Sequence, residues 1–165
     1  MAEPLSFVKR RIQAEIDQLK KILNVPVEVS DPSLSHFPLE ITITLLKTPG
    51  PYLKDGKIST RYTHRLKLIL EADYPYRKPT VHWLTPIFHP NIMPPHEGGY
   101  ICTKILKVWT SNSTLTTFVQ AIITLLANPN PYDPLGNDAC LMSAQYFAKH
   151  PYKPPSIIPK EEEDQ

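Results

Sequence analysis

Two stretches decide the fold: EITITL at residues 40–45 and RYTHRLKLILE at residues 61–71. In both, aliphatic side chains recur at every second position. A repeat of two is the spacing of side chains on one face of a β-strand. The aliphatic members are Ile41, Ile43, Leu45, Leu66, Leu68 and Leu70. We therefore predict two strands, each with one face in a core.

Two further strands are predicted beside these. One lies at residues 25–29, where valine occupies every second position, and the other at residues 81–84. The chain between the strands carries a turn signal at residues 48–51 and a polar loop at residues 55–57, with no helical pattern. Strands that follow one another without helices pair as an antiparallel meander. The sequence thus predicts a four-stranded antiparallel sheet.

Helical patterns lie before and after these strands. Residues 5–23 carry an apolar stripe with the steps of three and four residues that mark an amphipathic helix. Its members are Leu5, Val8, Ile12, Ile16, Leu19 and Leu23. A central buried helix is predicted at residues 114–127, before Asn128-Pro129, and a last helix at residues 138–149. The fold class is therefore α+β: an N-terminal helix, the meander, then C-terminal helices packed on the sheet.

Proline is unusually frequent, with 19 in 165 residues. The chain is nevertheless 41% hydrophobic and 21% charged, so it can bury a core and is not a disordered coil. Nine prolines fall in residues 75–95 and 129–134, which we interpret as ordered, extended loops. We expect one domain over residues 1–150 and a Pro-rich, acidic C-terminal tail at residues 151–165.

The charge balance and the cysteine count limit the class of protein. Four of the 16 acidic residues lie at 161–164, so residues 1–160 carry a formal charge of +6. The basic residues are scattered, and we predict no nucleic-acid partner. With no apolar run long enough to span a bilayer and no secretory pattern, we predict no membrane partner. Two cysteines allow at most one disulfide, which favours a reducing, cytoplasmic location.

Cys102 is the candidate nucleophile. It lies in GGYICTKIL at residues 98–106, where the glycines permit close backbone approach and Lys104 favours a thiolate. Cys140 stands in a helical, apolar pattern and is expected to be a core residue. A cysteine hydrolase with His89 or His96 as base is an alternative, although no signature of one surrounds Cys102.

A metal or cofactor is not predicted. A zinc site would have to use His89, His96, Cys102 and Cys140, and these lack the paired spacing of zinc ligands. The glycines match neither phosphate-binding motif, so no nucleotide cofactor is expected.

Five motifs in order resemble the ubiquitin-conjugating enzyme family, over roughly residues 7–147. They are YPYRKP at 74–79, HPNI at 89–92, IC at 101–102 followed by IL at 105–106, Trp109, and NPNPYDPL at 128–135. The resemblance implies the fold predicted above. It also implies that Cys102 accepts ubiquitin or a ubiquitin-like modifier as a thioester from an activating enzyme. The enzyme then passes the modifier to a substrate lysine with a ligase, which we expect to be of the RING type.

The resemblance also implies roles for other residues. Asp133 would orient the incoming amine and accept its proton, or would instead be a helix cap or turn carboxylate. The Asn91 amide would stabilise the oxyanion, or would instead hold the loop. His89 is expected to be a structural hydrogen-bonding residue. Ligase contacts are implied at Tyr76, Trp109, Thr110, Ser111 and Asn112, and contacts with the activating enzyme at Lys9, Arg10 and Arg11.

The chain departs from the family pattern at several places. Met93–Gly99 is an apparent insertion before the cysteine, Trp109 comes one residue early, and Lys104 stands where an aspartate is frequent. The family's usual last helix is expected to be absent. A non-catalytic, ubiquitin-binding variant of the same fold is the alternative function, and such variants lack the cysteine that this chain has.

Overall fold

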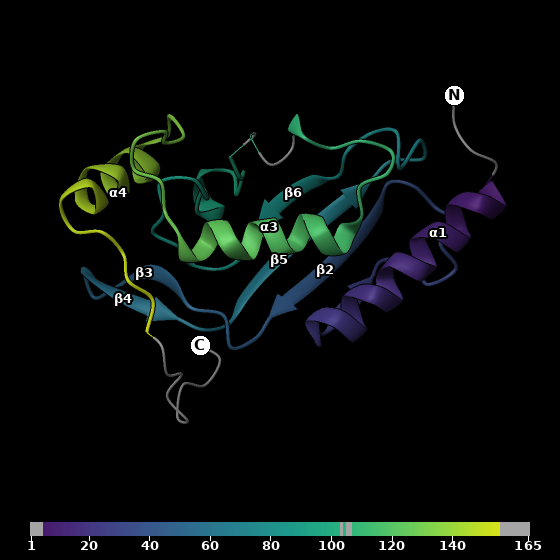
Figure 1. Ribbon diagram of the computed structural model, residues 1–165, viewed down its shortest axis with the longest axis horizontal. Coiled ribbons are helices and arrows are strands. Elements are labelled where there is room, and N and C mark those ends of the chain that lie inside the picture. Colours follow the sequence, from purple (N-terminus) through teal and green to yellow (C-terminus); the bar gives the residue numbers. More distant parts are fainter. Residues whose placement is uncertain (1–4, 103, 105–106, 156–165) are drawn as a thin grey trace.

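The computed structural model describes residues 5–102, 104 and 107–155, and its first element is helix α1, Leu5–Gln18 (Figure 1). A π-helical turn, Leu19–Leu23, continues it. Four members of the predicted stripe are buried: Val8, Ile12, Ile16 and Leu19. Leu5, the first residue of α1, is 49% exposed, and Leu23 is partly buried against the core.

The predicted four-stranded antiparallel meander is confirmed. Its strands are β1 (Val27–Val29), β2 (Leu39–Leu45), β5 (His64–Leu70) and β6 (Thr80–Trp83), and they pair in the order β1-β2-β5-β6. All the aliphatic side chains that predicted the two central strands are fully buried. Ile41 pairs with Leu68 in the register of β2 and β5, so both strands place the same kind of side chain on the core face.

A second, two-stranded sheet was not predicted. Strands β3 (Gly50–Lys54) and β4 (Lys57–Arg61) form a hairpin in the region interpreted as a turn and a loop. Only Asp55 and Gly56 are the turn, with φ of +51° and +76°, which is the backbone of a tight hairpin. Gly50 is the first residue of β3, and glycine is needed there because a Cβ would lie 2.6 Å from the Leu126 side chain. The prediction of a strand starting at residue 61 is therefore wrong, and β5 starts at His64.

Two helices cover the sheet and its end, as predicted. Helix α3 (Leu115–Ala127) crosses the face of the sheet, and α4 (Asp138–Lys149) lies at the end that carries the β3–β4 hairpin (Figure 1). The Thr114 side chain caps α3 by accepting a hydrogen bond from the Thr117 N–H at 3.2 Å. Phe118 and Ile122 belong to the same hydrophobic core as the sheet and α1.

The proline-rich segment between β6 and α3 is ordered, as expected. Two isolated β-bridges, His89 to Ile92 and Ile92 to Ile101, fold it back on itself. A short 3-10 helix, Pro95–Glu97, lies in the loop that the second bridge closes. As a result, the backbone of Cys102 lies next to the backbone of Asn91.

After α4 the chain contacts strand β4 and α4 through Tyr152. The Tyr152 hydroxyl lies 2.9 Å from the Thr60 hydroxyl, and its ring packs against Phe147. No helix follows α4 in the described residues up to 155. Within the described ranges, no helix combines the length and apolar character needed to cross a membrane.

Candidate active site

Cys102 is held by its backbone and is partly open to solvent. Its N–H donates to the Asn91 carbonyl at 2.8 Å, immediately after the bridge between Ile92 and Ile101. The N–H of Met93 donates to the Tyr100 carbonyl at 2.8 Å, which closes the loop that contains the predicted insertion. The position of the sulfur-bearing residue is thus set by main-chain contacts with the His-Pro-Asn segment.

Asn91 is the centre of this arrangement. It is 1% exposed, and its Oδ1 accepts from the Asn130 N–H at 2.7 Å. Its Nδ2 donates to the carbonyls of Asn130 and Asp133, both at 3.1 Å. The Nδ2 group of Asn91 therefore has two carbonyl acceptors, and both belong to the loop at residues 130–133.

His89 holds the backbone of Asn91 through its imidazole ring. Its Nδ1 accepts from the Asn91 N–H at 3.0 Å, and its Nε2 donates to the Leu125 carbonyl at 2.8 Å. Burial lowers the pKa of His89 to about 4, so the ring is neutral at pH 7. The prediction that His89 is a structural hydrogen-bonding residue is confirmed, because neither ring nitrogen is open to act as a base.

Asp133 lies on the loop that Asn91 holds. Its carboxylate forms an ion pair with the Lys104 ammonium, and both side chains are largely exposed. The hydrogen bond and charge of Asp133 raise the pKa of Lys104 above its ordinary value. Asp133 is not a helix cap, because the N-cap of α4 is Asn137. The departure from the family at Lys104 is therefore a charged contact inside the candidate site.

The apparent insertion is fastened to α4. Glu97 Oε1 accepts from Asn137 Nδ2 at 2.5 Å and from the Ala139 N–H at 3.1 Å, and these bonds lower the pKa of Glu97. Gly99 has φ of +69°, and a Cβ there would lie 2.7 Å from the Trp83 carbonyl oxygen. The close backbone approach that the glycines were predicted to permit is therefore made by Gly99, to Trp83 of strand β6. Sequence reasoning missed Glu97, because nothing near it in the chain indicates that its partners lie forty residues away.

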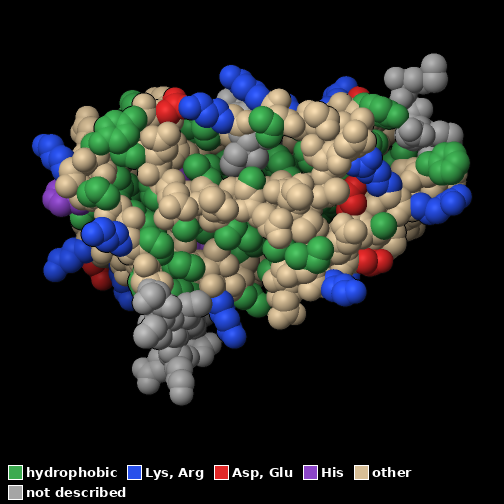
Figure 2. Space-filling model, viewed as in Figure 1, with side chains coloured by type: hydrophobic (Ala, Val, Ile, Leu, Met, Phe, Trp, Pro, Cys, Tyr) green, Lys and Arg blue, Asp and Glu red, His purple; other side chains and the backbone are tan. Residues whose placement is uncertain are grey.

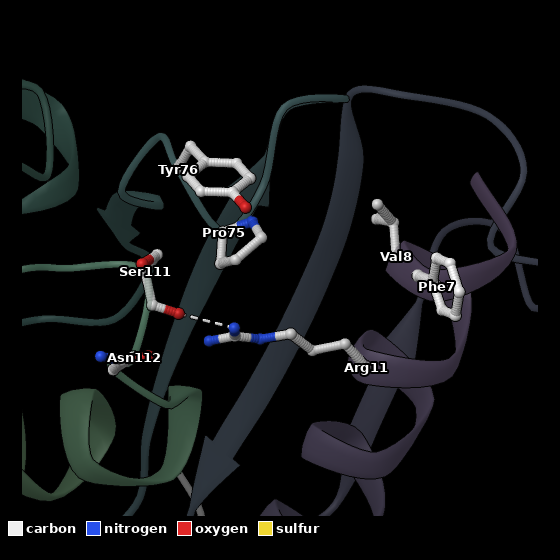
Figure 3. Close-up of a pocket in the computed structure, with 7 residues that line it drawn as sticks. All are labelled: Phe7, Val8, Arg11, Pro75, Tyr76, Ser111 and Asn112. Carbon is white, nitrogen blue, oxygen red and sulfur yellow. Dashed lines mark hydrogen bonds between the residues drawn. The ribbon is translucent and has the colours of Figure 1, made fainter. Parts of the chain in front are cut away.

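A cavity of about 430 Å³ lies between α1 and two loops (Figure 3). Its lining residues are Phe7, Val8, Arg11, Pro75, Tyr76, Ser111 and Asn112. Arg11 crosses its floor and donates to the Ser111 and Ser113 carbonyls, both at 2.6 Å. The cavity therefore joins Tyr76, Ser111 and Asn112 from the expected ligase contacts, together with Phe7, which the sequence did not single out.

The other expected contact residues lie near this cavity in different environments. Trp109 is half-buried: its Nε1 donates to the Pro75 carbonyl at 2.7 Å and its ring packs against Tyr74 and Phe118. Thr110 is exposed. On α1, Lys9 is half-buried, and Arg10 is exposed with its guanidinium 5.3 Å from the Phe7 ring centroid.

Glu15 is a buried acid that the sequence analysis missed. Its carboxylate accepts from Arg11 Nε at 2.8 Å, from the Tyr74 hydroxyl at 2.9 Å and from the Leu115 N–H at 2.7 Å. It connects α1 to the start of α3 and to the loop that precedes Tyr76. The available signal was its place next to Ile16 on the apolar side of the helix.

Cys140 is a core residue, as expected. It is fully buried, its thiol lies 3.6 Å from the Ile92 carbonyl, and burial raises its pKa to about 11. Neither cysteine is in a disulfide. Among the described residues, no three histidine, cysteine or acidic side chains converge in a way that could hold a metal ion.

Comparison with known proteins places this geometry in a family. The model of the family described as "Ubiquitin-conjugating enzyme" matches residues 11–154. Ubiquitin-conjugating enzyme E2 13 of Saccharomyces cerevisiae is 37% identical over 137 residues, which is 81% of each chain. A probable ubiquitin-conjugating enzyme of Acanthamoeba polyphaga mimivirus is 30% identical over 131 residues, 78% of each chain.

Solved structures agree with the sequence comparison. The E2 domain of a Toxoplasma gondii ubiquitin-conjugating enzyme superposes with a TM-score of 0.64 at 27% identity, covering 86% of this chain and 88% of its own. Ubc12 of Saccharomyces cerevisiae gives 0.62 at 26% identity, covering 87% and 78%. The chain belongs to the ubiquitin-conjugating enzyme family.

Proposed function

We propose that this chain carries ubiquitin, or a ubiquitin-like modifier, as a thioester on Cys102 and passes it to a substrate lysine. The observation that carries the proposal is the double use of Asn91. Its carbonyl binds the Cys102 N–H, and its side chain binds the backbone of Asp133. One buried residue thus holds the nucleophile and the carboxylate segment in a single assembly.

The first step exchanges one thioester for another. The Cys102 thiolate attacks the modifier's C-terminal thioester on the activating enzyme, whose cysteine leaves as thiolate. A thioester is already activated, so this step needs no strong base in the conjugating enzyme. The absence of an available base nitrogen on His89 is therefore consistent with the proposal.

The second step needs help with the amine. A lysine has an ordinary pKa near ~10.4 and must lose a proton before it can attack. The Asp133 carboxylate is 47% exposed, so an incoming ammonium can reach it. We assign Asp133 the orientation of that amine and the acceptance of its proton. Asn91 is a positioning residue for this step in the observed arrangement.

The cavity beside α1 is the proposed ligase site, with a ligase of the RING type. Phe7 and Tyr76 are 53% and 51% exposed at its edges, and exposed aromatic side chains beside a pocket suit interface hot spots. Arg11 holds the loop with Ser111, so it shapes the site from within. Lys9 and Arg10 remain the proposed contacts for the activating enzyme.

Two general observations fit this function. Figure 2 shows Lys and Arg side chains scattered over the visible face with no continuous basic stripe, so a protein partner is preferred over nucleic acid. A reducing, cytoplasmic setting would keep the Cys102 thiol available for charging. The alternative, a non-catalytic ubiquitin-binding variant, is less favoured because Cys102 is present and accessible.

The test is a charging assay with an activating enzyme, ATP and ubiquitin, and a second modifier if ubiquitin is not accepted. We expect an adduct on a non-reducing gel that reductant removes. Cys102→Ala should abolish it, and Cys102→Ser should give an ester that survives reductant. Cys140→Ala is the matched control and should charge normally. An adduct that persists unchanged in Cys102→Ala would refute the proposal.

A further inference from the structure

The carboxylate assigned to the acceptor amine already holds an amine of this chain. Asp133 Oδ2 is paired with Lys104 Nζ, and Lys104 lies two residues after Cys102. The exposed fractions of the two side chains are 68% for Lys104 and 47% for Asp133, so the contact faces solvent at the mouth of the site. A substrate lysine that binds Asp133 therefore competes with Lys104 for the same carboxylate.

Lys104 is suited to occupy this position and unsuited to react from it. Asp133 raises the pKa of Lys104 through a hydrogen bond and its charge. The side chain therefore stays an ammonium ion, which has no lone pair for attack on a thioester. A carboxylate paired with one ammonium also binds a second ammonium less well, because the first already offsets its charge.

We propose that Lys104 is a specificity-determining residue that slows transfer to free lysine and favours acceptor lysines with a neighbouring carboxylate. This inference rests on the function proposed above. When the acceptor ammonium replaces Lys104 on Asp133, a glutamate beside the acceptor gives Lys104 a new partner. A neutral acceptor segment gives it none, so the exchange costs an ion pair.

The covalent step itself does not involve Lys104. The acceptor nitrogen bonds to the C-terminal carbonyl carbon of ubiquitin, and the bond from that carbon to Cys102 sulfur breaks. The acceptor ammonium loses two protons: one passes to Asp133 before the attack, and the other passes to the departing Cys102 sulfur, which leaves as a thiol. Lys104 acts only on how the acceptor amine reaches its place.

The size of the effect follows from the exposure of the pair. Ion pairs between exposed side chains change an equilibrium constant by about 1.4- to 5-fold. Lys104→Ala should therefore speed discharge to free lysine by about 2- to 5-fold at subsaturating lysine. High salt should reduce this gain, since it screens exposed charges.

The experiment charges the full chain with ubiquitin, removes ATP and follows single-turnover loss of the thioester. The nucleophiles are free lysine, hydroxylamine, and two peptides whose one lysine is flanked by glutamate or by glutamine. Hydroxylamine is uncharged at neutral pH and does not need Asp133, so its rate should be the same with and without Lys104. Lys67→Ala is the matched control, because Lys67 forms a similar surface pair with Glu40 at 3.0 Å on the sheet.

The expected pattern is specific. Lys104→Ala should accelerate lysine but not hydroxylamine, and should lose the wild-type preference for the glutamate peptide. In an Asp133→Asn background the same substitution should have no further effect on lysine. Lys67→Ala should behave as wild type.

Several results would overturn the inference while charging remains normal. These are an unchanged or slower lysine rate in Lys104→Ala, an equal acceleration of hydroxylamine, or ubiquitin found in isopeptide linkage to Lys104. A wild-type chain that forms no thioester with any supplied modifier would instead overturn the proposed function, and this inference with it.

Discussion

Replacing Asn91 by alanine removes the side chain that ties residues 130–133 to the segment before Cys102. Three hydrogen bonds are lost: one accepted from the Asn130 N–H and two donated to the carbonyls of Asn130 and Asp133. The backbone bond from Cys102 to the Asn91 carbonyl does not depend on the side chain and should persist. The cysteine should therefore stay in place while the carboxylate segment loosens.

The magnitude can be worked from these contacts. Each hydrogen bond contributes about 0.5–1.5 kcal/mol net, which gives an upper range of about 1.5–4.5 kcal/mol for three. Asn130 is exposed, so water can replace some of the lost partners. We expect a loss of about 2–3 kcal/mol in the free energy of unfolding. For a chain of this size that corresponds to a fall of about 4–12 °C in Tm.

The assays are urea unfolding, the rate of charging, and the rate of discharge to free lysine. Asn128→Ala is the matched control, since that side chain is exposed and makes one bond, to the Thr124 carbonyl at 2.8 Å. It should cost no more than about 0.5 kcal/mol. Asn91→Ala should charge nearly normally and discharge slowly, and adding Asp133→Ala should slow discharge little further, because both changes remove the same carboxylate from its place.

One result would refute this reasoning. If Asn91→Ala unfolds like the wild type but discharges about 100-fold or more slowly, its amide acts on the oxyanion and not on the loop. Rate losses that multiply in the double variant would lead to the same conclusion.

Four other predictions follow from named contacts. Glu15→Gln should lower the free energy of unfolding by about 2–4 kcal/mol in urea titrations. The substitution removes the charge of a buried carboxylate and leaves the half-buried Arg11 guanidinium without its ion-pair partner. An unchanged midpoint of unfolding would contradict this. The free energy of unfolding should fall as the pH drops from 6.5 to 4. In the folded chain the pKa values of His64 and His89 are lowered to about 4, so over this range the unfolded chain binds protons that the folded chain does not. A free energy of unfolding that stays constant from pH 6.5 to 4 would refute this. Asp133→Ala should slow discharge to free lysine more than it slows charging, and equal effects on both rates would argue against its role with the amine. Tyr76→Ala should reduce ligase-stimulated discharge about tenfold with normal charging, and an unaltered response to a productive RING ligase would remove the cavity as its site.

The sheet and the helices could be predicted because their signals are local. The period of two at Ile41 and Leu68 and the apolar run before Asn128 each lie within one element and need no knowledge of partners. The β3–β4 hairpin could not be predicted as well. Pro49-Gly50-Pro51 reads as a turn, whereas Gly50 begins strand β3 and is glycine because the Leu126 side chain leaves no room for a Cβ. That cause lies 76 residues away in the sequence.

The candidate site shows the same division. The motif around Cys102 and the family resemblance named Cys102, Asn91 and Asp133, and the structure brings these three residues together. What the sequence could not show is that the Asn91 amide has carbonyl acceptors, because both acceptors are on a loop about forty residues later.

The two proline clusters can be explained by the hydrogen bonding of their backbone. A loop of extended backbone leaves many N–H and C=O groups without the partners that a helix or strand supplies. Proline removes one donor per residue and restricts φ, so the remaining groups can be satisfied by few contacts. In and beside the two clusters, three side chains bind backbone groups: Asn91 binds the carbonyls of Asn130 and Asp133, His89 binds the Leu125 carbonyl, and Glu97 binds the Ala139 N–H. These three side chains are occupied by backbone contacts, whereas Asp133 and Lys104 are largely exposed and paired with each other, so an acceptor can exchange with that pair. The choice of acceptor is therefore expected to depend on the Asp133–Lys104 pair. It is not expected to depend on the residues that hold the loops.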